Sequence, residues 1–206
     1  IGTSINAARE YLDNVVKILA EETGEDLKQA EDLVDATQNL DGFLEISAAV
    51  KNCALVMSKI ANDLRLLSSG PRGGFGEINL PARQHGSSIM PGKINPVMPE
   101  VVSQVAFCIA GNDVTIGMAA EAGQLELNAF EPILFYSLFQ SITLLSRVSR
   151  VFEAYCIRGI TANRQTCLRN LMDSTAMVTA LCPHIGYDRA TAIVEEALEK
   201  DRSVTE

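Results

Sequence analysis

The sequence has 206 residues, with 47% hydrophobic and 21% charged side chains and a formal net charge of −9. This composition predicts a globular protein with a substantial core, and it excludes intrinsic disorder as the main state. The 17 basic residues form no run or stripe, so neither nucleic acid nor an anionic membrane surface is expected as a partner.

The apolar runs and the cysteines limit the class further. The least polar run, at residues 133–146, is interrupted by Ser137, Gln140 and Thr143, whereas a membrane span needs roughly 20 apolar residues. The sequence also starts at Ile1 and stops within a helical pattern, so we expect a fragment of a longer chain. The cysteines are odd in number and widely spaced, which predicts reduced thiols in a cytoplasmic protein and no disulfide framework or metal site: Cys53, Cys108, Cys156, Cys167 and Cys182.

The first elements are expected to be two helices. Over residues 6–23 the apolar positions follow helical spacing, with Asn6 as the predicted N-cap and Gly24 as the stop. A short second helix is predicted at residues 26–34, before a polar stretch at 35–39.

The next segment has the most regular pattern of the chain. Its apolar residues recur at alternating intervals of three and four, which makes an unbroken heptad seam. The seam predicts a helix over residues 43–67, about 36 Å long, and Pro71 is expected to end it. The seam consists of Phe43, Ile46, Val50, Cys53, Met57, Ile60, Leu64 and Leu67.

Two further long helices are expected after a short extended piece at residues 77–81. The first follows Pro99 and runs to about residue 122, with polar interruptions such as Asn112 and Asp113 that need partners if they are buried. The second covers residues 132–155 and has no charge in its first half, so we expect burial in a bundle interior or a subunit interface.

The chain past Gly159 is expected to break into shorter helices, with Asp188 as an N-cap. These helices are predicted at residues 163–170, 171–181 and 188–200.

These patterns together predict an all-α fold. Its first part, residues 1–158, would be an elongated bundle of long helices, and residues 159–206 would begin a small helical C-terminal domain. The seams favour assembly with copies of the same chain. The alternative is a monomeric helical domain that packs against a missing part of its own chain.

The stretch 86–99 has a loop composition between two helical patterns, and it holds the candidate site. Gly86 and Gly92 permit positive φ and a close approach of main-chain N–H groups to a ligand. Lys93 offers a point charge, and Ser88 and Asn95 offer hydrogen bonds, which together suit a small anionic substrate.

Ser87 remains in this loop as a candidate base or nucleophile. The alternative that the composition leaves open is a turn rich in glycine, proline and serine with one solvated lysine.

The string at residues 86–96 resembles the Gly-Ser-Ser-x-Met-Pro-x-Lys-x-Asn-Pro signature of the aspartase/fumarase superfamily. Residues 59–72, 77–81 and 119–128 also resemble the aspartase branch, and the similarity covers essentially the whole chain. The fumarase branch shares the loop and the helix before it, so the branch is less specific than the superfamily.

The resemblance implies a fold, an assembly and a chemistry. The fold would be a long five-helix bundle, and four subunits would pack their bundles into a homotetramer whose active sites each collect residues from three subunits. The reaction would be the elimination of ammonia from L-aspartate to give fumarate, with no metal and no organic cofactor. Ser87 would take the Cβ proton as general base, and Ser88, Lys93 and Asn95 would hold the carboxylates of the dicarboxylate substrate.

Residues around the loop receive weaker expectations. Glu100 matches a carboxylate that pairs with an active-site histidine in the fumarase branch, but it would equally serve as a first-turn acid that complements the helix dipole. His85 and His184 are expected to have no catalytic role. Arg65 and Arg72 are expected to be ion-paired structural residues.

Two other functions stay open at this point. A fumarate hydratase has the same fold and the same loop. A non-catalytic oligomerisation module is also consistent with the sequence, because the upstream family segments that carry other site residues, including the N-terminal domain, are missing.

Overall fold

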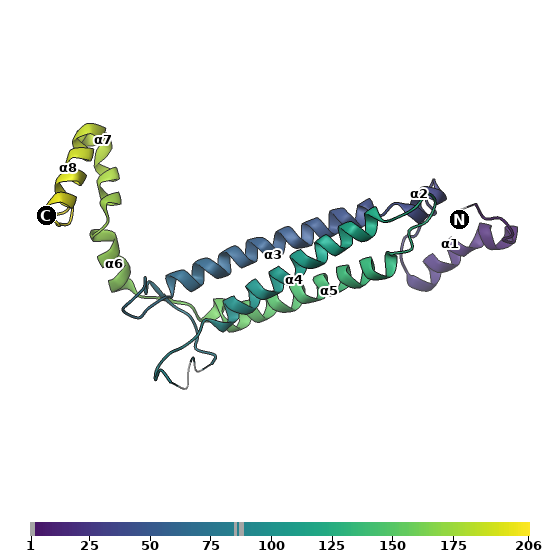
Figure 1. Ribbon diagram of the computed structural model, residues 1–206, viewed down its shortest axis with the longest axis horizontal. Coiled ribbons are helices and arrows are strands. Elements are labelled where there is room, and N and C mark those ends of the chain that lie inside the picture. Colours follow the sequence, from purple (N-terminus) through teal and green to yellow (C-terminus); the bar gives the residue numbers. More distant parts are fainter. Residues whose placement is uncertain (1–2, 85, 87–88) are drawn as a thin grey trace. The chain divides into compact units, whose positions relative to one another are not determined.

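A computed structural model describes residues 3–84, 86 and 89–206, and it confirms the all-α class (Figure 1). The strands are two residues each, and they form one antiparallel pair. The α-helices are α1 (Arg9–Thr23), α2 (Leu33–Gln38), α3 (Asp41–Leu67), α4 (Val97–Glu121), α5 (Glu131–Tyr155), α6 (Arg164–Met172), α7 (Cys182–Ile185) and α8 (Tyr187–Glu199). The 3₁₀ helices are η1 (Ile157–Gly159) and η2 (Thr175–Leu181), and the strands are β1 (Ile78–Asn79) and β2 (Thr161–Ala162).

The chain divides into two compact units. One consists of the chain up to Lys59 together with residues 101–150, and the other consists of residues 60–100 and 151–206. The helices α3, α4 and α5 contribute to both units, because each crosses a boundary. The division at residue 158 that the sequence suggests stays a prediction.

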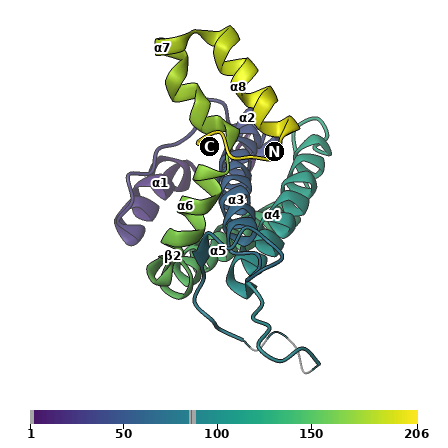
Figure 2. The ribbon, with the colours of Figure 1, turned by 90° about the vertical axis from the view of Figure 1, so that its left-hand side faces the viewer.

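The first unit is built on α3, α4 and α5, which lie side by side (Figures 1 and 2). Phe43 of α3 meets Phe135 of α5 edge to face, with ring centroids 4.8 Å apart. Each contact of this kind adds to the free energy of area burial. Two clusters of buried side chains lie in this unit: Leu40, Ile116, Ala119, Leu134 and Leu138, and Ala54, Ala106 and Ile109.

The helix predicted from the heptad seam is confirmed, but the seam is not its buried line. Ile46, Cys53 and Ile60 of the seam are exposed in this chain. Small residues pack inward instead, since they let a neighbouring backbone approach closely: Ser47, Ala54, Ser58 and Ala61. The other five seam residues are half-buried, so only part of the seam is left on an open face of α3: Phe43, Val50, Met57, Leu64 and Leu67.

The polar residues inside α4 have partners, as expected for buried polar groups. Asn112 donates to the Gln140 side chain at 2.9 Å and to the Ser141 hydroxyl at 3.0 Å, both on α5. Asp113 accepts from the Ser47 hydroxyl at 2.7 Å and pairs with Lys51, both on α3. These bonds fix the register of the three helices.

Burial and the hydrogen-bond partners of Asp113 shift its pKa in opposite directions. Desolvation is the largest single influence and raises the pKa. The hydrogen bonds from Lys51 and Ser47 and the Lys51 charge outweigh it together, so the pKa lies below its ordinary value. The carboxylate is thus ionised in the folded chain at neutral pH.

By length and composition alone, α4 is long and apolar enough to cross a membrane. No other helix in the described part of the chain meets this criterion, so residues 133–146 do not. A core helix of a bundle passes the same test, and α4 carries Asn112 and Asp113, which bond to its neighbours α5 and α3. We therefore interpret α4 as a core helix.

The N-terminal helices begin later than the sequence indicates. The first starts at Arg9 with Ala8 as its N-cap, so the prediction of Asn6 is wrong; Gly24 ends it at φ 72°, as expected. The helix predicted at residues 26–34 is also misplaced, because the Asp32 carboxylate caps α2 by accepting from the N–H of Val34 at 2.9 Å. A side-chain cap of this kind outweighs the weak propensity of the polar residues after it.

The C-terminal helices follow the prediction with shifted ends. Ser174 caps η2 by accepting from the N–H of Ala176 at 3.1 Å, so the helix predicted from residue 171 begins at Thr175, and residues 171 and 172 belong to α6. The N-cap of α8 is Gly186 and not Asp188, since Gly186 has φ 82° and Asp188 lies in the first turn. The extended piece expected at residues 77–81 is confirmed in β1, which pairs with β2.

Candidate functional site

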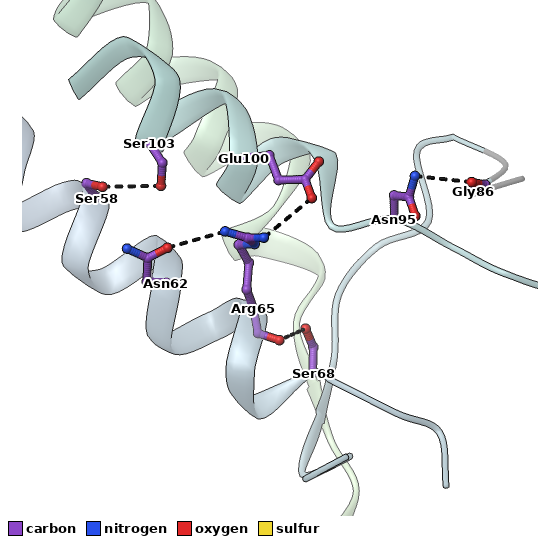
Figure 3. Close-up of polar contacts among 8 residues, drawn as sticks. All are labelled: Ser58, Asn62, Arg65, Ser68, Gly86, Asn95, Glu100 and Ser103. Atoms are coloured by element: carbon purple, nitrogen blue, oxygen red, sulfur yellow. Dashed lines mark hydrogen bonds and ion pairs between the residues drawn. The ribbon is translucent and has the colours of Figure 1, made fainter. Parts of the chain in front are cut away.

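The loop between β1 and α4 closes on itself through Gly86 (Figure 3). The Gly86 N–H donates to the Lys93 carbonyl at 2.6 Å, and the Asn95 side-chain amide donates to the Gly86 carbonyl at 3.2 Å. Both polar groups of the Gly86 backbone are therefore bound within the loop. Asn95 thus has a local role, whether or not it also meets a substrate.

Two glycines are needed for this geometry, for different reasons. A Cβ added to Gly86 would lie 2.6 Å from the Lys93 carbonyl oxygen, which is shorter than side chains allow. Gly92 has φ 81°, a conformation that other residues adopt at a cost. The positive φ expected in this loop is found at Gly92, whereas close approach of these backbone N–H groups to a ligand stays a prediction.

The end of the loop runs directly into α4. The helix starts at Val97, so Pro99 falls in its first turn, where a missing N–H costs little. Pro99 is also fully buried. Burial of this residue fixes where the loop meets the bundle.

Lys93 supplies the positive charge of the loop. Its side chain is exposed, and within residues 3–84, 86 and 89–206 its ammonium group forms no ion pair. It lies four residues before α4, whose N-terminus carries partial positive charge. A small anion at this loop would meet both charges.

Glu100 joins the loop end to α3. It lies in the first turn of α4, and its carboxylate is 3.7 Å from the Arg65 guanidinium (Figure 3). Arg65 also donates to the Asn62 side chain at 3.4 Å. The expected ion pairing of Arg65 is confirmed. Arg72 forms no such ion pair in the part of the chain that the structure describes.

Three residues named from the sequence, Ser87, Ser88 and His85, lie outside the described residues. Their roles, and those of Lys93 and Asn95 toward a substrate, stay predictions. The other histidine, His184, is exposed.

Arg83 is a residue of this region that the sequence reasoning missed. Its Nε donates to the carbonyl of Tyr155 at 2.9 Å, and its guanidinium carbon lies 5.0 Å from the centre of the Tyr155 ring. Next to it, burial raises the pKa of the Cys156 thiol, and the Arg83 charge partly offsets this. No local pattern points to Arg83, because its partner is 72 positions away in the sequence.

Two other kinds of ligand site, a metal site and a surface depression, can be examined in the described residues. Across the described residues no group of three His, Cys, Asp or Glu side chains could hold a metal ion. A depression of about 870 Å³ lies in the second unit, away from the signature residues, and its polar lining includes Arg72, Glu77, Asn170 and Asp173. The loop residues Gly86, Lys93 and Asn95 remain the best candidate site.

Two family models match parts of the chain, and the sequences of relatives match essentially all of it. A family model described as Lyase matches residues 1–111, and one described as Fumarase C C-terminus matches residues 177–206. The chain is 52% identical over 206 residues to an aspartate ammonia-lyase of Bacillus sp, and 49% identical over 204 residues to one of Helicobacter pylori. It spans 44% of the length of each of these relatives.

Two solved structures also align with nearly the whole chain. The structure of fumarate lyase:delta crystallin from Brucella melitensis bound to cobalt aligns with a TM-score of 0.91 at 48% identity, over 99% of this chain and 44% of that one. The class II fumarase from Schistosoma mansoni aligns with a TM-score of 0.91 at 34% identity, over 99% of this chain and 46% of that one.

Proposed function

This chain belongs to the lyase family of the aspartases and fumarases, and on that premise we propose that the full-length protein is an aspartate ammonia-lyase. It would convert L-aspartate reversibly to fumarate and ammonia. The observation that carries the proposal is the closed loop of Gly86, Lys93 and Asn95, which presents an exposed ammonium group four residues before a helix N-terminus.

The branch of the family is supported by sequence identity. Identity is 52% with the aspartate ammonia-lyase of Bacillus sp and 34% with the class II fumarase of Schistosoma mansoni. Fumarate hydratase remains the second candidate, since that fumarase aligns with the same TM-score of 0.91 as the Brucella structure.

The proposed chemistry assigns one task to each loop residue. A proton next to a carboxylate is a very weak acid, because its removal puts extra negative charge on the carboxylate oxygens. Lys93, Ser88 and Asn95 would stabilise that charge, and losing one such donor costs on the order of a hundredfold in rate. Ser87, as alkoxide, would take the proton from Cβ.

The electrons of the broken C–H bond then form the C=C bond of fumarate as the C–N bond breaks. The leaving nitrogen departs as ammonia, and Ser87 returns its proton to solvent. A serine hydroxyl is a poor base, so this role needs the positive field of Lys93 and exclusion of water from the loop. The chemistry as proposed uses no cofactor.

We also propose a homotetramer whose active sites are shared between subunits, in the cytoplasm. The support is the set of large apolar side chains that α3, α4 and α5 leave open, among them Val56, Phe107 and Phe139. Exposed apolar surface of this extent is typical of subunit interfaces. Neither nucleic acid nor a membrane is proposed as a partner.

One assay tests the proposed function. The full-length protein is incubated with L-aspartate or with L-malate, and the absorbance of fumarate is followed. We expect fumarate from aspartate, and Ser87→Ala should abolish it while the tetramer stays intact. Activity with malate alone would reject the aspartase in favour of the hydratase, and a wild-type kcat in Ser87→Ala would reject the base.

The alternative of a non-catalytic oligomerisation module is tested on residues 1–206 alone. We expect these residues to self-associate through the open faces of the long helices. Because they span less than half of the relatives, we expect them to show no lyase activity. A monomer in light scattering would contradict the interface argument.

A further inference from the structure

Residues 77–83 lead into the signature loop, and they are bound along their length to residues 155–163, at and after the end of α5. The backbone N–H of Asn163 donates to the Glu77 carbonyl at 2.8 Å, and β1 pairs antiparallel with β2. The contact keeps this register from residues 77, 78 and 79, which face residues 163, 162 and 161, to Pro81, which lies against Gly159. Arg83 then reaches Tyr155, two positions beyond the residue that this register would place opposite it.

The middle of this contact between residues 77–83 and 155–163 is closely packed. The side-chain amide of Asn79 donates to the Asn163 side chain at 2.6 Å. A Cβ added to Gly159 would lie 2.5 Å from the Pro81 ring, so the two backbones approach as closely as a glycine allows. All these residues belong to one compact unit of the chain.

Arg83 makes the last contact between these two segments, three residues before Gly86. Its charged Nε–H donates to the Tyr155 carbonyl, one of the last carbonyls of α5, which has no partner within the helix. A charged donor makes this bond stronger than a neutral one. The guanidinium also lies over the Tyr155 ring, which adds a cation–π attraction.

We propose that Arg83 is a positioning residue of the signature loop: by fixing the stem to the end of α5, it sets where the Gly86–Lys93 closure and the Lys93 charge lie. Its value for catalysis rests on the proposed lyase function. Loop anchoring is a physical property that can be measured without activity.

The test compares four variants of the full-length protein with wild type. Arg83→Met removes the donor and the charge, and Arg83→Lys keeps the charge but replaces the forked guanidinium by a single ammonium group. Arg158→Met is the matched control, since Arg158 is also an exposed arginine just after α5 but pairs with Glu153 and not with the loop stem. Tyr155→Leu removes the ring and leaves the carbonyl.

The first readout is hydrogen exchange of the Gly86 amide, whose rate reports opening of the Gly86–Lys93 closure. We expect it to rise about tenfold or more in Arg83→Met, as for loss of a charge-assisted hydrogen bond. Arg83→Lys and Tyr155→Leu should have smaller effects. Wild-type exchange in Arg83→Met, or an equal rise in Arg158→Met, would overturn the proposal.

The second readout is the kinetics with L-aspartate. We expect kcat/KM to fall about tenfold in Arg83→Met and to recover in part in Arg83→Lys, with Tm unchanged. If wild type has no lyase activity, the proposed function fails while the exchange readout still decides the anchoring. If exchange rises and kcat/KM stays at the wild-type value, the anchor exists but does not position the site, and the proposal is rejected.

Discussion

Arg65 on α3 and Glu100 on α4 form an ion pair across 3.7 Å where the signature loop joins the bundle (Figure 3). Both side chains are more than a third exposed, so water screens the pair. The pair therefore contributes little to stability. Because Glu100 lies in the first turn of α4, the pair instead serves to tie the start of α4 to α3.

Replacing Glu100 separates its two candidate roles. We expect Glu100→Gln to lower kcat about tenfold, because it frees the Arg65 guanidinium at the loop base, and to lower stability by less than about 1 kcal/mol. Glu131→Gln is the control, since Glu131 is the first-turn acid of α5. Equal kinetics in the two variants would leave Glu100 with the helix-dipole role alone.

Removing the Asn95 side chain should open the loop. Asn95→Ala loses the hydrogen bond to the Gly86 carbonyl, and with it a proposed donor to the substrate. We expect kcat/KM to fall on the order of a hundredfold, with thermal unfolding unchanged because the loop lies outside the bundle core. Asn62→Ala is the matched control, since Asn62 also makes one exposed side-chain bond nearby. Steady-state kinetics of the two variants decide the matter.

The two loop glycines should respond differently to alanine. In Gly86→Ala the new Cβ would meet the Lys93 carbonyl, so the closure must break and activity should be lost almost entirely. In Gly92→Ala nothing lies within 4 Å of the new Cβ, and only the positive φ is strained. That strain costs about 1–2 kcal/mol, so Gly92→Ala should keep measurable activity. Similar activity in both variants would argue against the closed loop as the working conformation.

The elements were predictable from the sequence where local chemistry decides them. Three long helices follow from heptad spacing, and Gly24 follows from its freedom at positive φ. The buried face of α3 was not predictable, because it depends on which helix packs against it: small side chains such as Ala54 face inward, and Ile46 remains open.

The loop was predictable as a site from its residue types and from its resemblance to a family signature. The contacts that hold it were not. Arg65 and Arg83 reach partners 35 and 72 positions away, so no local pattern identifies them. The same holds for Asp113, whose partner Lys51 is 62 positions away.

Acid should weaken the bundle through Asp113. Its pKa is lower in the folded chain than its ordinary value, so its contribution is fully present above the unfolded pKa of about 3.9 and is lost as pH falls through the folded pKa. Asp113→Asn should cost about 1–2 kcal/mol at pH 7 and less near pH 3. Thermal unfolding midpoints at both pH values measure this.

The control for that experiment is Asp173→Asn. Asp173 is exposed, and the described residues give it no ion pair. We expect no pH-dependent difference from wild type in this variant. A constant loss in Asp113→Asn between pH 7 and pH 3 would show that the carboxylate charge is not the stabilising feature.

Self-association should depend on the open face of α4. Phe107, Val114 and Met118 share one stripe of the helix and are 66%, 62% and 69% exposed in the single chain. Burying side chains of this size yields about 1.5–3 kcal/mol each, so a second copy covering the stripe would be strongly held. Phe107→Asp should therefore lower the mass measured by light scattering, with helicity retained in circular dichroism. Leu198→Asp is the matched control, because Leu198 on α8 is 68% exposed but lies outside the long helices. An unchanged mass in Phe107→Asp, or an equal loss in Leu198→Asp, would move the subunit interface away from α4.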